Sequence, residues 1–392
     1  MTQADVVILG AGAAGLMAAI EAGRRGRRVI VLDHARAPGE KIRISGGGRC
    51  NFTNLDMRAE RFLSENPRFA MSALGRFTPW DFIARMAAAG LGWEEKAEGQ
   101  LFCAGSARNL VAMLMTDLNA AGATLHLSTP IETVTHGPDG FRVATPRGPF
   151  VAPRLVVATG GRSIPKMGAS GLGYRIAQDF GLRVVDQRPG LVPLTLGGGL
   201  LSRAAALAGV SLQAEIATPH RRFRGGLLFT HRGLSGPAVL QASSYWHEGE
   251  AVTLDLAPGQ RPAETLRARR AEHPRQMLSR ALAADLPERL AADIVAAEGL
   301  EGRLGTISNA ALDRLDAALH RWSLVPQGTE GWRTAEVTLG GVATDALDGR
   351  TLAARKVPGL HFVGEVVDIT GWLGGYNLQW AWSSGWAAGQ AV

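Results

Sequence analysis

The 392-residue sequence is short of cysteine, lysine and long apolar runs. Its two cysteines, Cys50 and Cys103, form neither a CxxC motif nor a zinc-binding spacing, so the sequence supports neither a disulfide-built fold nor a dithiol redox centre. The apolar stretch at residues 6–20 is broken by three glycines and is too short to cross a membrane. No basic segment precedes it, as one would in a signal peptide. We therefore expect no membrane partner and a cytoplasmic location.

What the sequence has in excess is glycine and arginine. Hydrophobic residues make up 46% and charged residues 20%, which excludes disorder as the main state. The 50 glycines follow no collagen period and predict many tight turns or close ligand contacts. The net charge is +7, and only four of the 42 basic residues are lysines. Because the arginines are spread along the chain, we interpret them mainly as solvated surface and expect no nucleic-acid partner.

The N-terminal residues predict one nucleotide-binding βαβ unit. Residues 6–9 are typical of a buried strand, 16–25 of a helix and 28–33 of a second strand. Between strand and helix lies a GxGxxG motif, in which the first glycine permits a turn, the second lets a pyrophosphate approach and the third lets helix and strand pack. The predicted dinucleotide contacts here are Gly10, Gly12, Ala13, Ala14, Gly15, Asp33 and His34. An acid at residue 33 suits a ribose diol and disfavours a 2′-phosphate, so FAD or NAD is expected rather than NADP.

A second motif covers residues 39–54, which we interpret as a glycine-rich loop. Its glycines could wrap a flat ligand and its polar side chains could donate hydrogen bonds along a pyrophosphate towards a flavin ring. The alternative is a purely structural Ω-loop. The candidate contacts are Lys41, Ser45, Gly46, Gly48, Arg49, Cys50, Asn51 and Asn54. A redox role for Cys50 is disfavoured because the sequence offers no second cysteine nearby.

The segment at 39–54, together with residues 158–165, 228–237, 364–368 and 374–379, resembles the bacterial BaiN-like, or YhiN-like, FAD-dependent oxidoreductases. The resemblance spans nearly the whole chain and implies an α/β fold: a Rossmann-like FAD-binding domain interrupted by a β-rich domain with a helical insert. The implied boundaries are 1–190 and 336–392 for the FAD-binding domain, 191–257 and 322–335 for the β-rich domain, and 258–321 for the insert.

The resemblance also implies further FAD contacts. A second contact segment comprises Ala158, Thr159, Gly160 and Gly161, and the backbone of Val134 would lie against the adenine. A third comprises Gly364, Glu365 and Asp368. The last comprises Gly374, Gly375, Tyr376, Asn377 and Leu378, where the N–H groups of a helix start would stabilise negative charge on the reduced flavin. Trp372 stands where a smaller residue is usual.

These patterns together predict an FAD-dependent oxidoreductase acting on a small molecule. The favoured reaction is reduction of an activated C=C bond with NAD(P)H as donor. The alternatives are a flavin amine oxidase using oxygen, an RNA-associated flavoprotein that uses the arginines of the insertion, and a redox sensor without turnover. The sequence assigns no catalytic residue and no metal site.

Three predictions of local structure can be compared with the fold. Residues 69–90 read as one helix, residues 138–140 as a hairpin turn, and Ser235 as the N-cap of a helix that starts at Pro237. Four C-terminal tryptophans, Trp372, Trp380, Trp382 and Trp386, are interpreted as packing residues rather than a substrate cage.

Overall fold

The computed structural model describes residues 2–392. The chain divides into two compact units, which are described separately. Unit 1 comprises Met1–Arg188 and Val337–Val392, and unit 2 comprises Pro189–Glu336. Unit 1 is thus built from both ends of the chain. The assignment of these segments to FAD-binding, β-rich and insert domains with the boundaries given above stays a prediction.

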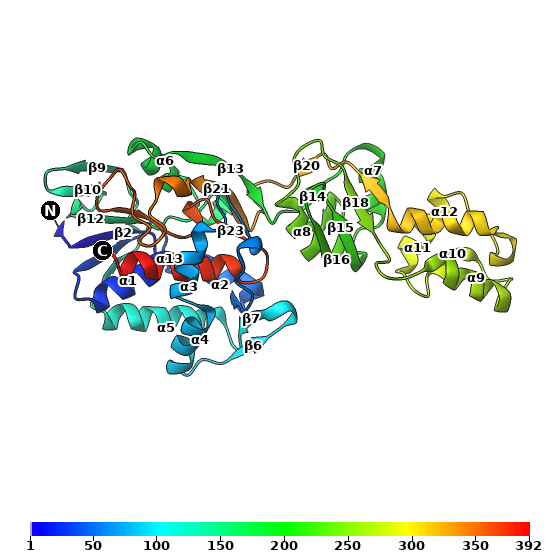
Figure 1. Cartoon of the computed structure of the whole chain (residues 1–392), viewed down its shortest axis with the longest axis horizontal. Helices are drawn as coiled ribbons and strands as arrows, with labels where there is room; N and C mark the ends of the chain where they lie inside the picture. Colours follow the sequence, from blue (N-terminus) through cyan, green and yellow to red (C-terminus); the bar gives the residue numbers. More distant parts are fainter. Residues whose placement is uncertain (1) are drawn as a thin grey trace. The chain divides into compact units, whose positions relative to one another are not determined.

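Unit 1 is organised around a parallel five-stranded sheet with the order β22-β12-β2-β3-β8. The central strands are apolar because both of their faces are buried, as in β2 and β3. Helices α1 and α13 pack against each other beside this sheet, and α5 packs on α1 (Figure 1). The bounds are β2 Val6–Leu9, α1 Ala13–Arg24, β3 Val29–Leu32, α5 Ala107–Ala120, β8 Thr124–His126, β12 Arg154–Val157, β22 Leu360–Phe362 and α13 Tyr376–Gly389. The predicted Rossmann-type α/β fold is confirmed.

Smaller sheets complete unit 1. A four-stranded sheet has the order β1-β11-β10-β9, and its β9–β10 hairpin turns where the Pro-Asp-Gly sequence predicted. Its strands are β1 Thr2–Gln3, β9 Thr133–Gly137, β10 Gly140–Ala144 and β11 Phe150–Ala152. The other small sheets pair β5 Phe62–Leu63 with β23 Thr370–Gly371, β13 Val184–Gly190 with β21 Val337–Val342, and β7 Gln100–Cys103 with both β4 Asn51–Asn54 and β6 Trp93–Glu95. Helix α6, Leu172–Asp179, precedes β13.

Two sequence-based interpretations of unit 1 were wrong. The segment at 39–54 is not a loop throughout: it forms α2 Glu40–Ile44, the 3-10 turn η1 Ser45–Gly48 and strand β4. The single helix expected at 69–90 is two helices, α3 Phe69–Arg76 and α4 Pro79–Ala88. The chain breaks there because Thr78 caps α4 in a capping box with Asp81, and Pro79 occupies the first helical position.

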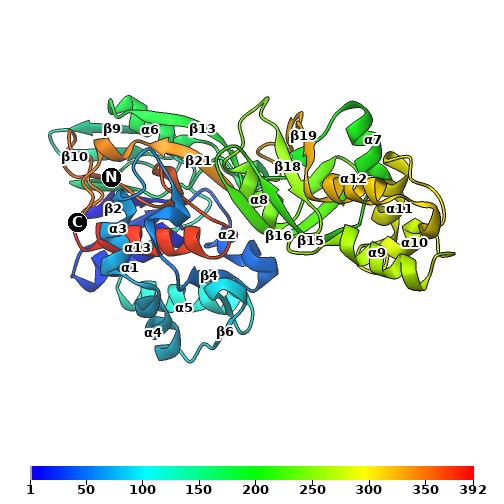
Figure 2. The same ribbon diagram turned by 45° about the vertical axis from the view of Figure 1, so that its right-hand side comes forward.

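Unit 2 combines an antiparallel seven-stranded sheet with helices. The strand order is β19-β18-β15-β16-β17-β14-β20. Figure 2 shows this sheet followed by the helices α9 to α12. The bounds are β14 Leu194–Thr195, α7 Gly198–Ala206, β15 Ser211–Ala217, β16 Arg222–Thr230, β17 Gly233–Ser235, α8 Pro237–Ser243, β18 Val252–Asp255, α9 Pro262–Glu272, α10 Leu278–Leu282, α11 Glu288–Ala297, α12 Asn309–His320, β19 Trp322–Leu324 and β20 Gly328–Thr329.

The start of α8 corrects the predicted N-cap. Gly236 occupies that position with φ 97°, while Ser235 ends strand β17. A side chain at 236 would place its Cβ 2.6 Å from the carbonyl oxygen of Gly226, so the close approach of α8 to β16 requires glycine there. Pro237 does begin the helix, as predicted.

Among residues 2–392, no helix is long and apolar enough to cross a membrane.

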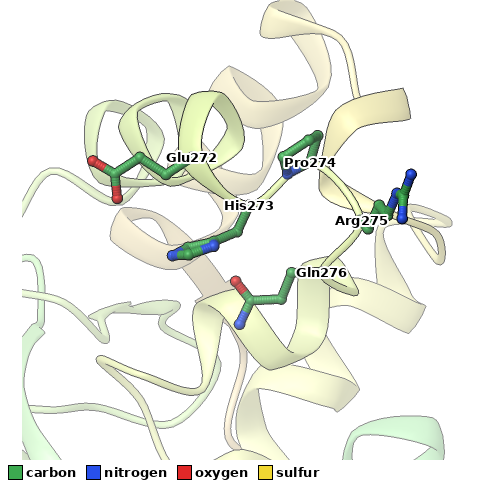
Figure 3. Close-up of a pocket in the computed structure, with 5 residues that line it drawn as sticks. All are labelled: Glu272, His273, Pro274, Arg275 and Gln276. Atoms are coloured by element: carbon green, nitrogen blue, oxygen red, sulfur yellow. The ribbon is translucent and has the colours of Figure 1, made fainter.

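A shallow hollow at the C-terminal end of α9 is lined by Glu272, His273, Pro274, Arg275 and Gln276 (Figure 3). This hollow belongs to unit 2 and contains none of the residues predicted to bind FAD.

Candidate cofactor site

The GxGxxG turn is built from glycines with two different roles. At Gly10 (φ 109°), a Cβ would lie 2.4 Å from the carbonyl oxygen of Ala158, and at Gly15 a Cβ would lie 1.9 Å from that of Gly10. Any side chain at these two positions would therefore displace backbone. At Gly12, by contrast, a Cβ would meet no atom within 4 Å. Gly12 borders open space at the carboxyl end of β2, which is where dinucleotides bind on such sheets.

Helix α1 starts at this open space without a side-chain cap. Gly12 is its N-cap residue and makes no side-chain hydrogen bond, so the first backbone N–H groups have no capping group. An uncapped helix N-terminus with room in front of it suits an anion such as a pyrophosphate. The observed turn therefore fits the group that the motif predicts, and Ala13 and Ala14 contribute their backbone to it.

Asp33 also accepts backbone hydrogen bonds, which the sequence did not predict. Its two carboxylate oxygens accept hydrogen bonds from the backbone N–H groups of Ala11 (2.6 Å) and Ala35 (2.8 Å). The carboxylate thus holds the glycine-rich turn against the end of β3. A carboxylate accepts about four hydrogen bonds, so capacity for a ribose diol remains. His34, half exposed, lies 3.5 Å from Asp33 and against the backbone at Gly168.

Lys41 and Glu365, both predicted as cofactor contacts, are bonded to each other. The Lys41 Nζ lies 2.7 Å from Glu365 Oε2 and 2.6 Å from the hydroxyl oxygen of Ser163. The other carboxylate oxygen accepts the N–H of Thr338 at 2.9 Å. Burial alone would raise the pKa of Glu365, but Lys41 and the N–H groups of Thr338 and Gly161 outweigh burial and hold that pKa below its usual value. The pair joins α2 to the third predicted contact segment.

The segment Ala158 to Gly161 lies between these groups. Ala158 approaches Gly10, and a Cβ at Gly161 would lie 2.7 Å from the Glu365 carboxylate. The hydroxyl of Thr159 is buried and has no hydrogen-bond partner among residues 2–392. Gly364 packs closely against α1, since a Cβ at Gly364 would lie 2.9 Å from the Cβ of Ala14. The structure thus brings the first three predicted contact segments together at one end of the sheet.

The last predicted segment lies against β4. The Asn54 amide donates to the carbonyl of Gly374 at 2.9 Å, and a Cβ at Gly375 would lie 2.2 Å from the carbonyl oxygen of Thr53. Gly375 (φ 94°) is the N-cap of α13 and makes no side-chain cap hydrogen bond. A second uncapped helix start therefore follows the two glycines, at Tyr376, which is the feature expected to stabilise a reduced flavin.

Several polar residues predicted as cofactor contacts also bond within the protein. The Asn377 side chain donates to the carbonyl of Gly371 and accepts from its N–H, both at 2.8 Å, and thereby fixes the turn before α13. Ser45 donates to the carbonyl of Ile42 at 2.8 Å. Arg49 pairs with Glu94, and the Asn51 amide, in the orientation that satisfies its hydrogen bonds, donates to the carbonyl of Leu101 at 3.1 Å.

Cys50, Tyr376 and Asp368 are buried ionisable groups. Burial raises the pKa of Cys50 and of Tyr376 to about 12, so both keep their protons at neutral pH. Cys50 is therefore not an activated thiol, as the sequence reasoning favoured. Asp368 accepts hydrogen bonds from the hydroxyl of Ser64 and the N–H of Glu65, yet burial raises its pKa.

The remaining predicted residues have no distinctive polar contact. Val134 lies on β9 opposite Val143 in the small sheet, and Leu378 is half-buried in the first turn of α13. Gly46 packs on Phe102, and Gly48 has no atom within 3.4 Å of a Cβ position. Trp380 and Trp382 are fully buried, which fits their expected packing role. The ring of Trp372 faces the Arg61 guanidinium, 4.3 Å from its centroid.

Comparison with known proteins identifies the family. The family described as HI0933-like protein Rossmann domain matches residues 4–391. The chain is 48% identical to the ribosomal RNA dihydrouridine synthase of Escherichia coli (strain K12), over all of this chain and 98% of that protein. It is 28% identical to a 3-dehydro-bile acid delta(4,6)-reductase of Clostridium scindens, over 98% of both.

A solved structure supports the fold over the whole chain. A 3-ketosteroid-delta4-(5alpha)-dehydrogenase from Rhodococcus jostii RHA1 superposes with a TM-score of 0.55 at 14% identity, covering all of this chain and 96% of that one. The described turn, helix starts and strand ends fit FAD, and the family match covers almost every residue. The chain therefore belongs to the HI0933-like Rossmann family of FAD-dependent oxidoreductases.

Proposed function

We propose that the protein is an FAD-dependent reductase that saturates the C5=C6 bond of a uridine in ribosomal RNA. The observation that carries the proposal is the 48% identity, over the whole chain, to the Escherichia coli ribosomal RNA dihydrouridine synthase. The Clostridium scindens relative is also named as a reductase. Uracil C5=C6 is conjugated with a carbonyl, so it is an activated C=C bond of the kind that the sequence analysis favoured.

The reaction balances with a reduced nicotinamide as the donor. Uridine, NAD(P)H and one proton give dihydrouridine and NAD(P)+, with a hydride added at one carbon of the double bond and a proton at the other. FAD, when bound, supplies hydride and electron transfer between donor and substrate. The choice of donor is part of the proposal. Unit 1 has one dinucleotide fingerprint, and in this scheme FAD occupies it, so NAD(P)H would bind without a fingerprint of its own.

The chain's own residues supply binding and electrostatics in this scheme. The N-termini of α1 and α13, both without side-chain caps, would hold a pyrophosphate and stabilise negative charge on a reduced ring respectively. The Lys41–Glu365 pair ties α2 to the segment after β22. We assign no proton donor to the substrate.

The RNA substrate reverses an expectation from composition. Unit 1 contains 26 Lys and Arg residues and 20 Asp and Glu residues, whereas unit 2 contains 16 Lys and Arg and 15 Asp and Glu. The positive excess therefore belongs almost entirely to the FAD-binding unit. Within the helical insert, Arg267 pairs with Asp313 and Arg269 with Asp285. RNA phosphates would thus be attracted to unit 1, and the arginines of the insertion do not carry the proposal.

A complementation experiment tests the substrate. The protein is produced in an Escherichia coli strain that lacks the 48% relative, and dihydrouridine in the ribosomal RNA is mapped by mass spectrometry. We expect the modification to return, and to stay absent with a Gly12→Asp variant, which we predict not to bind FAD. Absence of dihydrouridine despite a flavin-loaded protein would contradict the RNA substrate. Purified protein offered a conjugated steroid enone with NADPH then tests the small-molecule alternative.

A further inference from the structure

Unit 2 contains a cluster of titratable side chains that includes none of the residues predicted to bind FAD. His220, His247 and Glu250 come from two separate connections of the antiparallel sheet. His220 lies in the turn between β15 and β16, and the other two lie between α8 and β18. Because β15 pairs with both β16 and β18, with Ala217 opposite Arg222 and Thr253, these connections meet at the same end of the sheet.

The three side chains converge on one point. The His220 Nε2 is 3.0 Å from Glu250 Oε1, and the His247 Nδ1 is 3.5 Å from Glu250 Oε2. One nitrogen or oxygen atom of each residue lies within 4.8 Å of those of the other two. In a tetrahedral zinc site with bonds of about 2.0–2.2 Å, neighbouring ligand atoms lie about 3.3–3.6 Å apart. The two short separations, which end on the two different oxygens of the Glu250 carboxylate, are close to this spacing.

The backbone holds His247 and Glu250 in place. The N–H of His247 donates to Glu250 Oε2 at 2.9 Å, and the N–H of Glu250 donates to the carbonyl of His247 at 3.1 Å. The Trp246 indole donates to the carbonyl of Glu250 at 2.8 Å. Both histidines are exposed, so an ion could reach the cluster from solvent.

We propose that His220, His247 and Glu250 form a binding site for one divalent transition-metal ion of the Zn2+ type. Two imidazoles and one carboxylate are a ligand set that zinc accepts, with water completing the coordination. The ion would fasten the β15–β16 turn to the α8–β18 connection. All three ligands belong to unit 2, which contains none of the residues predicted to bind FAD.

The test uses the full-length, untagged, FAD-loaded protein, freed of metal with a chelator and titrated with Zn2+ by calorimetry. We expect one ion per chain. His220→Asn and His247→Asn should each weaken binding about tenfold or more, because each removes one of three protein ligands. The matched control is His273→Asn, an exposed histidine of the same unit beside Glu272 but outside the cluster (Figure 3). It should bind like the unmodified protein.

Thermal unfolding gives a second readout. Zn2+ should raise the unfolding temperature of the wild-type protein and of the His273 variant, because a ligand that binds only the folded state stabilises it. It should not raise that of the His220 or His247 variants. No saturable binding by the wild-type protein, or equal binding by all variants, would overturn the proposal. Flavin content is measured in parallel, so loss of FAD is recognised separately from loss of zinc.

Discussion

Replacing Gly12 with aspartate should separate FAD binding from folding. Gly12 is the N-cap of α1, its φ is −83°, and a side chain there would meet no atom within 4 Å. Aspartate is a favoured N-cap because its carboxylate accepts hydrogen bonds from the first N–H groups of a helix. The variant without FAD should therefore unfold at the same temperature as the wild-type protein or slightly higher, with a gain of a few tenths of a kcal/mol.

The same carboxylate should abolish FAD binding. It would occupy the N–H groups that a pyrophosphate needs and would place a negative charge beside it. Two like unit charges about 4–5 Å apart repel by about 3–4 kcal/mol at an effective dielectric constant of about 20. That repulsion alone weakens binding about two hundredfold or more, since about 1.4 kcal/mol is tenfold. FAD fluorescence quenching on titration of the flavin-free protein measures this affinity.

Gly15→Ala is the matched control for the structural role of the motif. Its new Cβ would lie 1.9 Å from the carbonyl oxygen of Gly10. The backbone must move to accommodate it, so this variant should lose about 1–3 kcal/mol of stability even without FAD. Wild-type FAD affinity in the Gly12→Asp variant would refute the assignment of the turn as the pyrophosphate site. A large drop in its unfolding temperature would show that Gly12 is needed for packing after all.

Three further predictions concern ionisable groups of unit 1. Lys41→Met should lower the free energy of unfolding by about 1–2 kcal/mol, which is less than for a fully buried pair because Lys41 is partly exposed. Because the pKa of Glu365 is lowered, its contribution to stability is present above pH 4.5 and is lost as pH falls through the lowered value, so urea unfolding of wild type and variant should converge in acid. Because Cys50 and Cys103 are buried and the pKa of Cys50 is about 12, iodoacetamide at pH 8 should label neither thiol until the protein is unfolded. Rapid labelling of Cys50 in the folded protein would contradict its buried position. The raised pKa of Asp368 means that the free energy of unfolding falls as pH rises from the usual pKa of 3.8 towards the raised value. Asp368→Asn keeps an amide oxygen that can accept from Ser64 Oγ, so in thermal unfolding at pH 7 it should be as stable as wild type or more stable. Clear destabilisation would show that the charge is needed.

Local patterns made the nucleotide-binding part of the fold predictable. The apolar run of β2, the glycines after it and the alanine-rich helix α1 are consecutive in sequence, and Gly10 and Gly15 each have a direct steric reason. The same holds for the β9–β10 hairpin, which a Pro-Asp-Gly turn fixes. Helix α2 escaped prediction because its five residues are too few to show a period, and the glycines that follow suggested a loop.

Contacts between distant segments could not be predicted from the sequence. The Lys41–Glu365 pair spans 324 positions and depends on how α2 meets the end of β22. Asp33 was predicted as a ligand contact because its carboxylate suits a ribose diol, and Asn377 because of the family resemblance; the structure also uses both side chains to hold backbone turns. The His220, His247 and Glu250 cluster has no motif spacing, because the fold of the sheet brings its two connections together.

The most direct measurement of the central claim follows the flavin and the RNA in one sample. The purified protein is titrated anaerobically with NADH or NADPH, and unmodified ribosomal RNA is then added. The proposed function predicts a flavin spectrum that one donor bleaches, and recovery of that spectrum on addition of RNA, with one dihydrouridine formed per flavin reoxidised. A bleached flavin that RNA leaves reduced, with no dihydrouridine formed, would contradict the account.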